Sequence, residues 1–100
     1  MAMQNYIGTV YGGAVAAIAE MVSIACARTV VSEDKELFLG ELSISYLSGA
    51  QNNAEVLVDA SVVRSGRNLT VVAVEFKLKK TEQLIYTARA TFYNRPVAML

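Results

Sequence analysis

Residues 12–27 read GGAVAAIAEMVSIACA, and this stretch decides the fold. After the two glycines, Glu20 and Ser23 are the only polar side chains up to Ala27. A helix formed from these residues is apolar almost all round and must be buried on nearly every side. An ionised carboxylate inside such a helix needs a partner, hydrogen bonds or a cleft. We therefore predict a core helix over residues 13–27 that carries a functional acid at Glu20.

The amino-acid composition excludes several classes of catalytic and binding site. The chain has 100 residues, 54% of them hydrophobic, and a formal net charge of zero, which indicates one small domain over residues 1–100 with no electrostatic case for nucleic acid. It contains one cysteine and no histidine. These counts exclude an internal disulfide, Ser-His-Asp and Cys-His catalysis, and a plausible zinc site, so we expect no metal-dependent chemistry. Cys26 is expected to be a small buried hydrophobe.

No membrane partner is expected either. The apolar run from Ala14 to Ile24 is shorter than the roughly 20 residues that a membrane span requires, and Glu20 interrupts it. The first residues lack the pattern of a signal or transit peptide. We expect a soluble intracellular protein, with cytoplasm, peroxisome or another organelle as open alternatives.

After a polar turn at Ser32–Glu36, the apolar residues recur with a period of two, which is typical of half-buried strands. The alternating sets are Leu42, Ile44 and Tyr46; Val56, Val58, Ala60 and Val62; and Val72, Val74, Phe76 and Leu78; a last strand covers about residues 84–92. Short turns between them favour an antiparallel meander.

A helix that is apolar almost all round and a sheet with a single apolar face bury their apolar surfaces most simply when the sheet curls around the helix. We therefore predict an α+β hotdog fold, with one long central helix wrapped by a curved antiparallel sheet. A chain of this size leaves much of an apolar helix uncovered, which favours a dimer.

Four motifs occur in an order and spacing that resemble a known family. They are NYIGTVYGG at residues 5–13, the acid at Glu20, LSISYLS at 42–48 and VVRSGR at 62–67. Over about residues 5–93 the chain resembles the hotdog-fold acyl-CoA thioesterase superfamily, phenylacetate-degradation (PaaI-like) type. The resemblance implies hydrolysis of an acyl- or aryl-CoA thioester to free acid and CoA without a cofactor, by a homodimer or a dimer of dimers (a homotetramer). Family members usually carry a strand, or a helix and a strand, before the Asn segment, so this fold is expected to be short at the N-terminus.

The resemblance assigns roles around the start of the helix. The Gly12 amide polarises the thioester carbonyl, in keeping with the unpaired donors of a helix N-terminus, and Gly13 lets the acyl group approach the backbone. The alternative is a tight strand-to-helix turn. Tyr11 replaces the histidine of most members, and its hydroxyl can still donate a hydrogen bond. Asn5 orients substrate or water, unless it is an ordinary turn residue.

Glu20 falls on the catalytic carboxylate of the family, as general base or as nucleophile. The alternative is a structural acid paired with Arg28 or with another cation inside the dimer. Eight helical residues separate Gly12 from Glu20 by about 12 Å, so Gly12 of one subunit is expected to work with Glu20 of its partner. Leu39 stands where some members position water with serine or threonine, and Ser23, one turn from Glu20, is a candidate substitute.

The CoA phosphates are assigned to the turn Arg64, Ser65, Gly66 and Arg67, because arginine binds phosphate through two hydrogen bonds. The alternative is a solvated hairpin in which Arg64 covers apolar surface. The acyl end is expected to meet Ala16, Ala17 and Met21. A non-catalytic hotdog dimer that binds acyl-CoA or plays a structural or regulatory role is the alternative function, whereas hydroxyacyl dehydratases of this fold use a histidine that is absent here.

Overall fold

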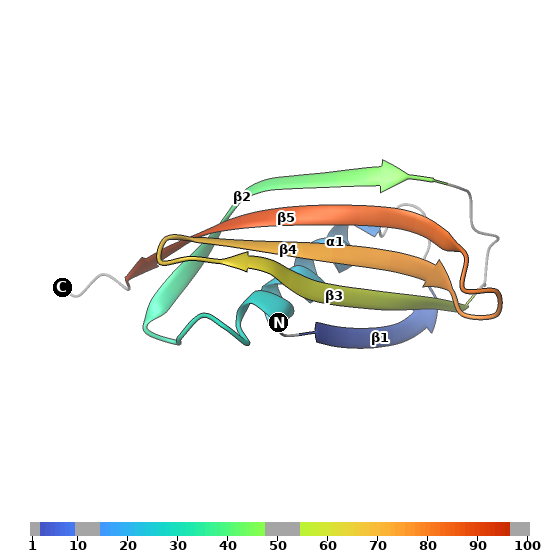
Figure 1. The fold of residues 1–100 in the computed structure, drawn as a ribbon, viewed down its shortest axis with the longest axis horizontal. Helices are drawn as coiled ribbons and strands as arrows, with labels where there is room; N and C mark the ends of the chain where they lie inside the picture. The colour runs from blue at the N-terminus through green and yellow to red at the C-terminus, as the bar shows by residue number, and fades with distance from the viewer. Residues whose placement is uncertain (1–2, 10–14, 48–54, 97–100) are drawn as a thin grey trace.

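The computed structural model describes residues 3–9, 15–47 and 55–96, which form one helix and five strands. All strands are antiparallel and make one sheet in the order β1-β3-β4-β5-β2. In Figure 1 the sheet curves in front of the helix, which lies behind the central strands. This arrangement confirms the predicted α+β hotdog fold. The elements are β1 (Met3–Thr9), α1 (Val15–Ala27), β2 (Lys35–Tyr46), β3 (Glu55–Ser65), β4 (Leu69–Leu78) and β5 (Leu84–Pro96).

The core lies between α1 and one face of the sheet. The predicted alternation is confirmed from Val56 to Val62 of β3 and from Val72 to Phe76 of β4, where every second side chain is buried, whereas Leu78 at the end of β4 is half-buried. Each fully buried valine or phenylalanine stabilises the fold by about 1.5–3 kcal/mol. The buried sheet residues are Val56, Val58, Ala60 and Val62 of β3, Thr70, Val72, Val74 and Phe76 of β4, and Ala88, Ala90 and Phe92 of β5.

The helix is buried along one stripe. Val15, Ala19, Val22 and Cys26 recur at helical spacing and pack mainly on β3 and β4. On the opposite side of α1, Met21 is 63% exposed. The expectation that the helix is buried on nearly every side is wrong for the single chain, since one sheet covers only one side of one helix.

The order of the strands differs from a simple meander. Only β3, β4 and β5 follow one another as neighbours, while β2 lies at the far edge beside β5. At the other edge β1, a strand that the sequence pattern did not predict, pairs with β3. Alternation of apolar residues determines which face of a strand is buried and does not determine its neighbour.

The segment between α1 and β2 is shorter than predicted, because β2 begins at Lys35 within the expected turn Ser32–Glu36. Arg28 ties this segment to the end of the helix. Its Nη1 donates to the carbonyl oxygens of Ser32, at 3.2 Å, and Lys35, at 2.7 Å. Through these two hydrogen bonds, the Arg28 guanidinium holds the segment between α1 and β2 against the end of the helix.

The two strands at the β2 edge also depart from the pattern in detail. Leu42 and Ile44 are half-buried as predicted, but Tyr46 is 64% exposed at the end of the edge strand, where its ring meets Tyr86 edge-on at 5.2 Å. β5 continues to Pro96, beyond the predicted end near residue 92.

A β-bulge at Gly40 bends β2 between Leu39 and Glu41. The Tyr93 ring of β5 lies over this glycine, and a Cβ atom built on Gly40 would come within 2.7 Å of Tyr93 Cδ2. A side chain added at this position would therefore force the Tyr93 ring to move.

Candidate active site

Glu20 lies in the middle of α1 on the side that faces away from the sheet. Its side chain is exposed, and so are its helix neighbours Ala16, Ala17, Met21 and Ile24. A carboxylate is therefore displayed on an otherwise apolar helix surface.

The alternative pairing of Glu20 with Arg28 is not seen within this chain. No salt bridge in the described ranges involves Glu20. The Arg28 guanidinium is engaged with the Ser32 and Lys35 carbonyls instead. The Glu20 carboxylate is therefore available for chemistry or for a partner chain.

Ser23 lies on the buried side of α1. Its side chain is fully buried, and its Oγ donates to the backbone carbonyl of Glu20 at 2.9 Å. This i to i−3 bond satisfies the hydroxyl within the helix. The geometry favours a structural role for Ser23 over the positioning of water.

Tyr11, Gly12 and Gly13 lie outside the described residues, and their roles stay predictions. Asn5 is part of β1, where the register places it opposite Asp59 of β3.

Leu39, at the position where some family members carry a hydroxyl, is 37% exposed and pairs with Phe92 just before the β2 bulge. The side chain has no group that could hold water, so this position supplies apolar surface.

The predicted phosphate-binding segment spans the end of β3 and the turn that follows: Arg64 and Ser65 are the last residues of β3, and Gly66 and Arg67 lie between β3 and β4. Arg64, Ser65, Gly66 and Arg67 are all exposed. The Gly66 amide donates to the Leu69 carbonyl at 2.7 Å, which closes the turn. Arg64 is therefore carried by the end of the strand and Arg67 by the short turn that the Gly66 hydrogen bond closes.

Two buried polar side chains, those of Asn94 and Thr70, hold this turn through hydrogen bonds. The side-chain Nδ2 of Asn94 donates to the Gly66 carbonyl at 3.3 Å and to Thr70 Oγ1 at 3.1 Å. The backbone N–H of Asn94 donates to the Asn68 carbonyl at 3.0 Å. Thr70 is fully buried and Asn94 is 6% exposed. Hydrogen bonds in such a buried place are expensive to lose, so the pair holds the turn in one conformation.

Lys35 is a functional candidate that the sequence reasoning missed. Its Nζ donates to the carbonyl of Arg67 at 3.4 Å, which brings a third cation from the start of β2 to the turn. The two residues are 32 positions apart, so local motif spacing carries no signal of the contact. Lys35 thus adds a cation beside the backbone of the turn that carries Arg67.

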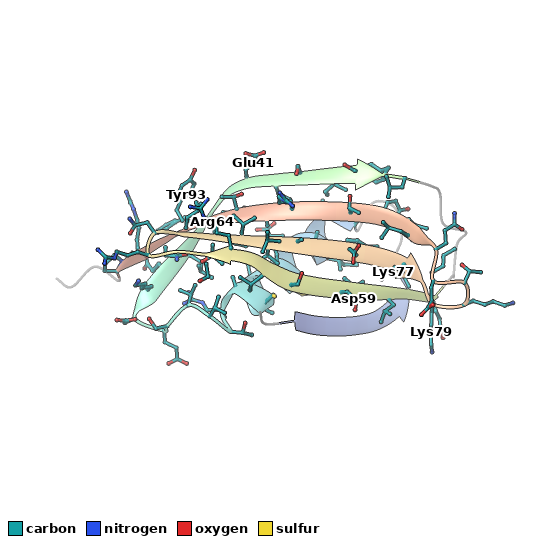
Figure 2. All side chains as sticks on the ribbon, in the orientation of Figure 1. Glu41, Asp59, Arg64, Lys77, Lys79 and Tyr93 are labelled. Atoms are coloured by element: carbon teal, nitrogen blue, oxygen red, sulfur yellow. The ribbon has the colours of Figure 1, made fainter. Side chains whose placement is uncertain are left out.

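The charges are paired at one end of the sheet and not at the other. Lys79 lies 3.2 Å from Glu55, and Lys77 lies 3.9 Å from Asp59. Figure 2 shows these lysines toward one end and Arg64 toward the opposite end. No salt bridge in the described residues involves the cations of the turn, so they retain their capacity for an anionic ligand.

Other kinds of site find no support in the described part of the chain. No group of three or more acidic, cysteine or histidine side chains there could hold a metal ion. Burial raises the pKa of the Cys26 thiol, which disfavours the reactive thiolate. Among the same residues, no helix combines the length and apolarity needed to cross a membrane.

Comparison with known proteins agrees with this fold. The chain is 26% identical over 87 residues to acyl-coenzyme A thioesterase 13 of Mus musculus, a match that takes in 87% of this chain and 61% of the relative. The chain therefore spans less than two thirds of the length of this curated relative.

Solved structures are similar over nearly the whole chain. A thioesterase from Haemophilus influenzae has a TM-score of 0.84 at 16% identity and covers 98% of this chain and 75% of its own. Zebrafish thioesterase superfamily member 2 has a TM-score of 0.80 at 21% identity and covers 92% and 74%. These two likenesses concern the fold. A mutant thioesterase enzyme from Staphylococcus aureus is 26% identical, with a TM-score of 0.71 and coverage of 89% and 73%.

The model of one family, described as the thioesterase superfamily, matches residues 7–85 of the 100. This range includes the whole of α1, β2, β3 and β4, and with them Glu20 and the turn at Arg64–Arg67. The chain belongs to the thioesterase superfamily.

Proposed function

We propose that this chain is an acyl-CoA thioesterase of the phenylacetate-degradation type, which hydrolyses an acyl- or aryl-CoA thioester to the free acid and CoA. The observation that carries the proposal is the Glu20 carboxylate, exposed and without a salt bridge in the described residues, on the apolar outer side of α1. Membership of the thioesterase superfamily and the likeness to an acyl-coenzyme A thioesterase supply the reaction class.

The proposed site is built from two copies of the chain. Gly12 precedes Glu20 by eight residues, about 12 Å along a helix, so one thioester cannot contact both on one chain. The exposed stripe of α1 offers a surface for the helix of a second copy, because Met21 and Ile24 there are apolar and lack cover. Two antiparallel helices related by a two-fold axis then form two equivalent sites, each with Gly12 of one chain and Glu20 of the other.

Glu20 acts on the thioester in one of two ways. As a general base it takes a proton from water, whose oxygen attacks the carbonyl carbon. As a nucleophile it attacks that carbon itself and forms an anhydride that water then cleaves. In both routes the carbonyl oxygen becomes an oxyanion, the C–S bond breaks and CoA leaves as the thiolate. The Gly12 amide stabilises the oxyanion.

The CoA phosphates bind at the turn formed by Arg64 and Arg67, with Lys35 as an added cation. Support comes from the exposure of both arginines, the absence of salt bridges to them in the described residues, and the Lys35 contact with the Arg67 carbonyl. Guanidiniums bind phosphate oxygens in pairs, and an ammonium adds a point charge.

Thioester hydrolysis by the Glu20→Gln variant tests the proposal. A panel of aryl- and medium-chain acyl-CoAs is followed by release of free thiol, with the molar mass of each sample recorded. Wild type is expected to turn over at least one ester, and Glu20→Gln to lose turnover by several powers of ten while it keeps its mass and binds CoA. The matched control, Glu36→Gln, changes an exposed glutamate of β2 and should retain activity.

Absence of turnover from a folded wild-type dimer would refute the enzyme and leave a hotdog protein that binds acyl-CoA or has a structural role. A Glu20→Gln variant as active as wild type would show that the carboxylate is not catalytic.

A further inference from the structure

Two exposed aromatic side chains lie side by side on the outer face of the sheet, the face that points away from α1. They are Phe38 of β2 and Tyr93 of β5, which are 46% and 51% exposed. Both neighbours of Tyr93 in the strand, Phe92 and Asn94, are buried, so the Tyr93 ring points to the opposite face. Phe38 is directly opposite Tyr93 in the register and shares that face. These two side chains form an aromatic platform.

A guanidinium is stacked beside this platform. The Arg95 Cζ atom lies 5.8 Å from the centre of the Phe38 ring, which is within the range of a cation–π contact. Arg95 is exposed, and no salt bridge in the described residues involves it. The contact with Phe38 therefore orients a cation that remains available to an anionic ligand.

The platform is fixed to the turn that carries Arg67. Asn94, which follows Tyr93 in β5, donates its backbone N–H to the Asn68 carbonyl at 3.0 Å. Because Asn68 directly follows Arg67, this hydrogen bond joins the strand of the platform to the predicted phosphate-binding turn. Figure 2 shows Tyr93 and Arg64 toward the same end of the sheet. Aromatic surface and unpaired cations therefore lie together at that end.

Two arginines flank the platform on the same face. Arg64 pairs with Val71, and Val71 pairs with Thr91. Thr91 and Arg95 lie two residues before and two residues after Tyr93, so all three side chains leave the same side of β5. The row that contains Arg64 and the position of Arg95 thus border the platform along the strands.

We propose, on the basis of the thioesterase function proposed above, that the aromatic platform binds the adenine base of CoA, with Arg95 as an added cation for its phosphates. In CoA a single ribose joins the base to the phosphates, so a base on Tyr93 leaves the phosphates beside the turn. Purines stack on aromatic rings and on guanidinium planes, and both surfaces are present here. The enzyme then selects thioesters that carry a nucleotide over thioesters of a carrier without a base.

A nucleotide fits this surface better than an apolar partner does. An apolar surface laid on the platform would desolvate the flanking arginines without an opposite charge, which is costly. A nucleotide supplies a base for the rings and phosphates for the guanidiniums. The Glu41 carboxylate stands at the β2 edge, opposite Thr91, so the phosphates are expected on the other side, toward Arg64 and the turn.

Two thioesters with the same acyl group separate the nucleotide from the reacting carbonyl. One is an acyl-CoA, and the other is the acyl thioester of N-acetylcysteamine, which lacks both base and phosphates. Tyr93→Leu and Phe38→Leu are expected to raise KM for the acyl-CoA about tenfold with kcat unchanged, and to leave kcat/KM for the truncated thioester as in wild type. Tyr93→Phe keeps the ring and should behave as wild type. The matched control, Tyr46→Leu, removes an exposed tyrosine at the other end of β2 and should not change the ratio of the two KM values.

Binding is also measured without turnover. Adenosine 3′,5′-bisphosphate carries the base and phosphates without the thioester, and it is titrated into each variant by calorimetry. Its Kd is expected to rise about tenfold in Tyr93→Leu, and about fivefold in Arg95→Gln with a difference that shrinks at high salt. Circular dichroism establishes that each variant is folded, and light scattering records its molar mass.

The two measurements separate the base site from the thioesterase activity. Hydrolysis of both thioesters with unchanged KM in folded Tyr93→Leu and Phe38→Leu would refute the base site and leave the thioesterase standing. A change in molar mass without a change in Kd would show that another copy covers this face, and it would refute the base site as well. Weaker binding of the bisphosphate by the variants of a chain that hydrolyses neither thioester would support the base site and refute the thioesterase.

Discussion

Replacement of Asn94 by alanine removes the polar support of the turn between β3 and β4 and leaves the fold of the sheet intact. The side chain of Asn94 bonds the Gly66 carbonyl and the Thr70 hydroxyl, at 3.3 and 3.1 Å. The loss of these two hydrogen bonds costs about 1 kcal/mol each in net terms. It also leaves the Thr70 hydroxyl, which is fully buried, without this partner, at a further cost of about 1–3 kcal/mol.

We therefore expect Asn94→Ala to lower the free energy of unfolding by about 3–5 kcal/mol, which corresponds to a fall in Tm of about 12–40 °C for a domain of this size. Urea denaturation at one fixed protein concentration measures the change, since self-association would make stability depend on concentration. The matched control is Asn68→Ala, which alters an exposed side chain of the same turn and keeps the backbone carbonyl that accepts from Asn94.

A double-mutant cycle with Thr70→Val separates the network from general loss of packing. Because each substitution removes one end of the same contact, the double variant should be less destabilised than the sum of the single variants by about 1–2 kcal/mol. The reasoning is refuted if Asn94→Ala costs no more than Asn68→Ala, or if the two substitutions of the buried pair are strictly additive.

Three further predictions each depend on one contact or on one buried group. Gly40→Ala should destabilise the fold by about 1–3 kcal/mol because its Cβ overlaps the Tyr93 ring, and Gly40→Ala combined with Tyr93→Ala should recover part of this loss in urea denaturation. Lys35→Ala should raise KM for an acyl-CoA about fivefold with kcat unchanged, an effect that shrinks at high salt; a change in kcat alone would contradict it. Burial raises the pKa of Cys26 above its ordinary 9.0, so the stabilisation from its protonated form is complete below that value and is lost as the pH rises through the folded pKa. The free energy of unfolding should therefore fall more steeply above about pH 9 in wild type than in Cys26→Ala, and equal slopes would refute this.

The alternation of apolar residues was sufficient to predict the fold class and the buried face of β3 and β4. It could not place β2, because the side-chain pattern of a strand is the same whichever strand lies beside it. The expectation of a fully buried helix failed for a related reason. Hydropathy records that a surface needs cover, and it does not say whether the cover comes from the same chain.

The candidate site was also predictable from the sequence only in part. Glu20 stood out in the sequence because a lone carboxylate in an apolar helix needs a reason, and the structure places it on the exposed side of α1. Lys35 and Asn94 did not stand out, because each reaches the turn through a contact between residues far apart in the chain. The roles of Tyr11, Gly12 and Gly13 stay predictions, since these residues lie outside the described ranges.

The exposed apolar side chains of the described residues lie on both sides of the molecule, and this distribution follows from its architecture. One helix on one sheet makes a single core layer, so the outer side of the helix and the outer side of the sheet both remain uncovered. Met21 is exposed on the first surface and Tyr93 on the second. In the proposed active site the outer side of the helix faces a second copy of the chain. Substitutions on the helix side, such as Met21→Lys, should therefore lower molar mass and turnover together, and a variant that lost turnover at unchanged mass would contradict this coupling.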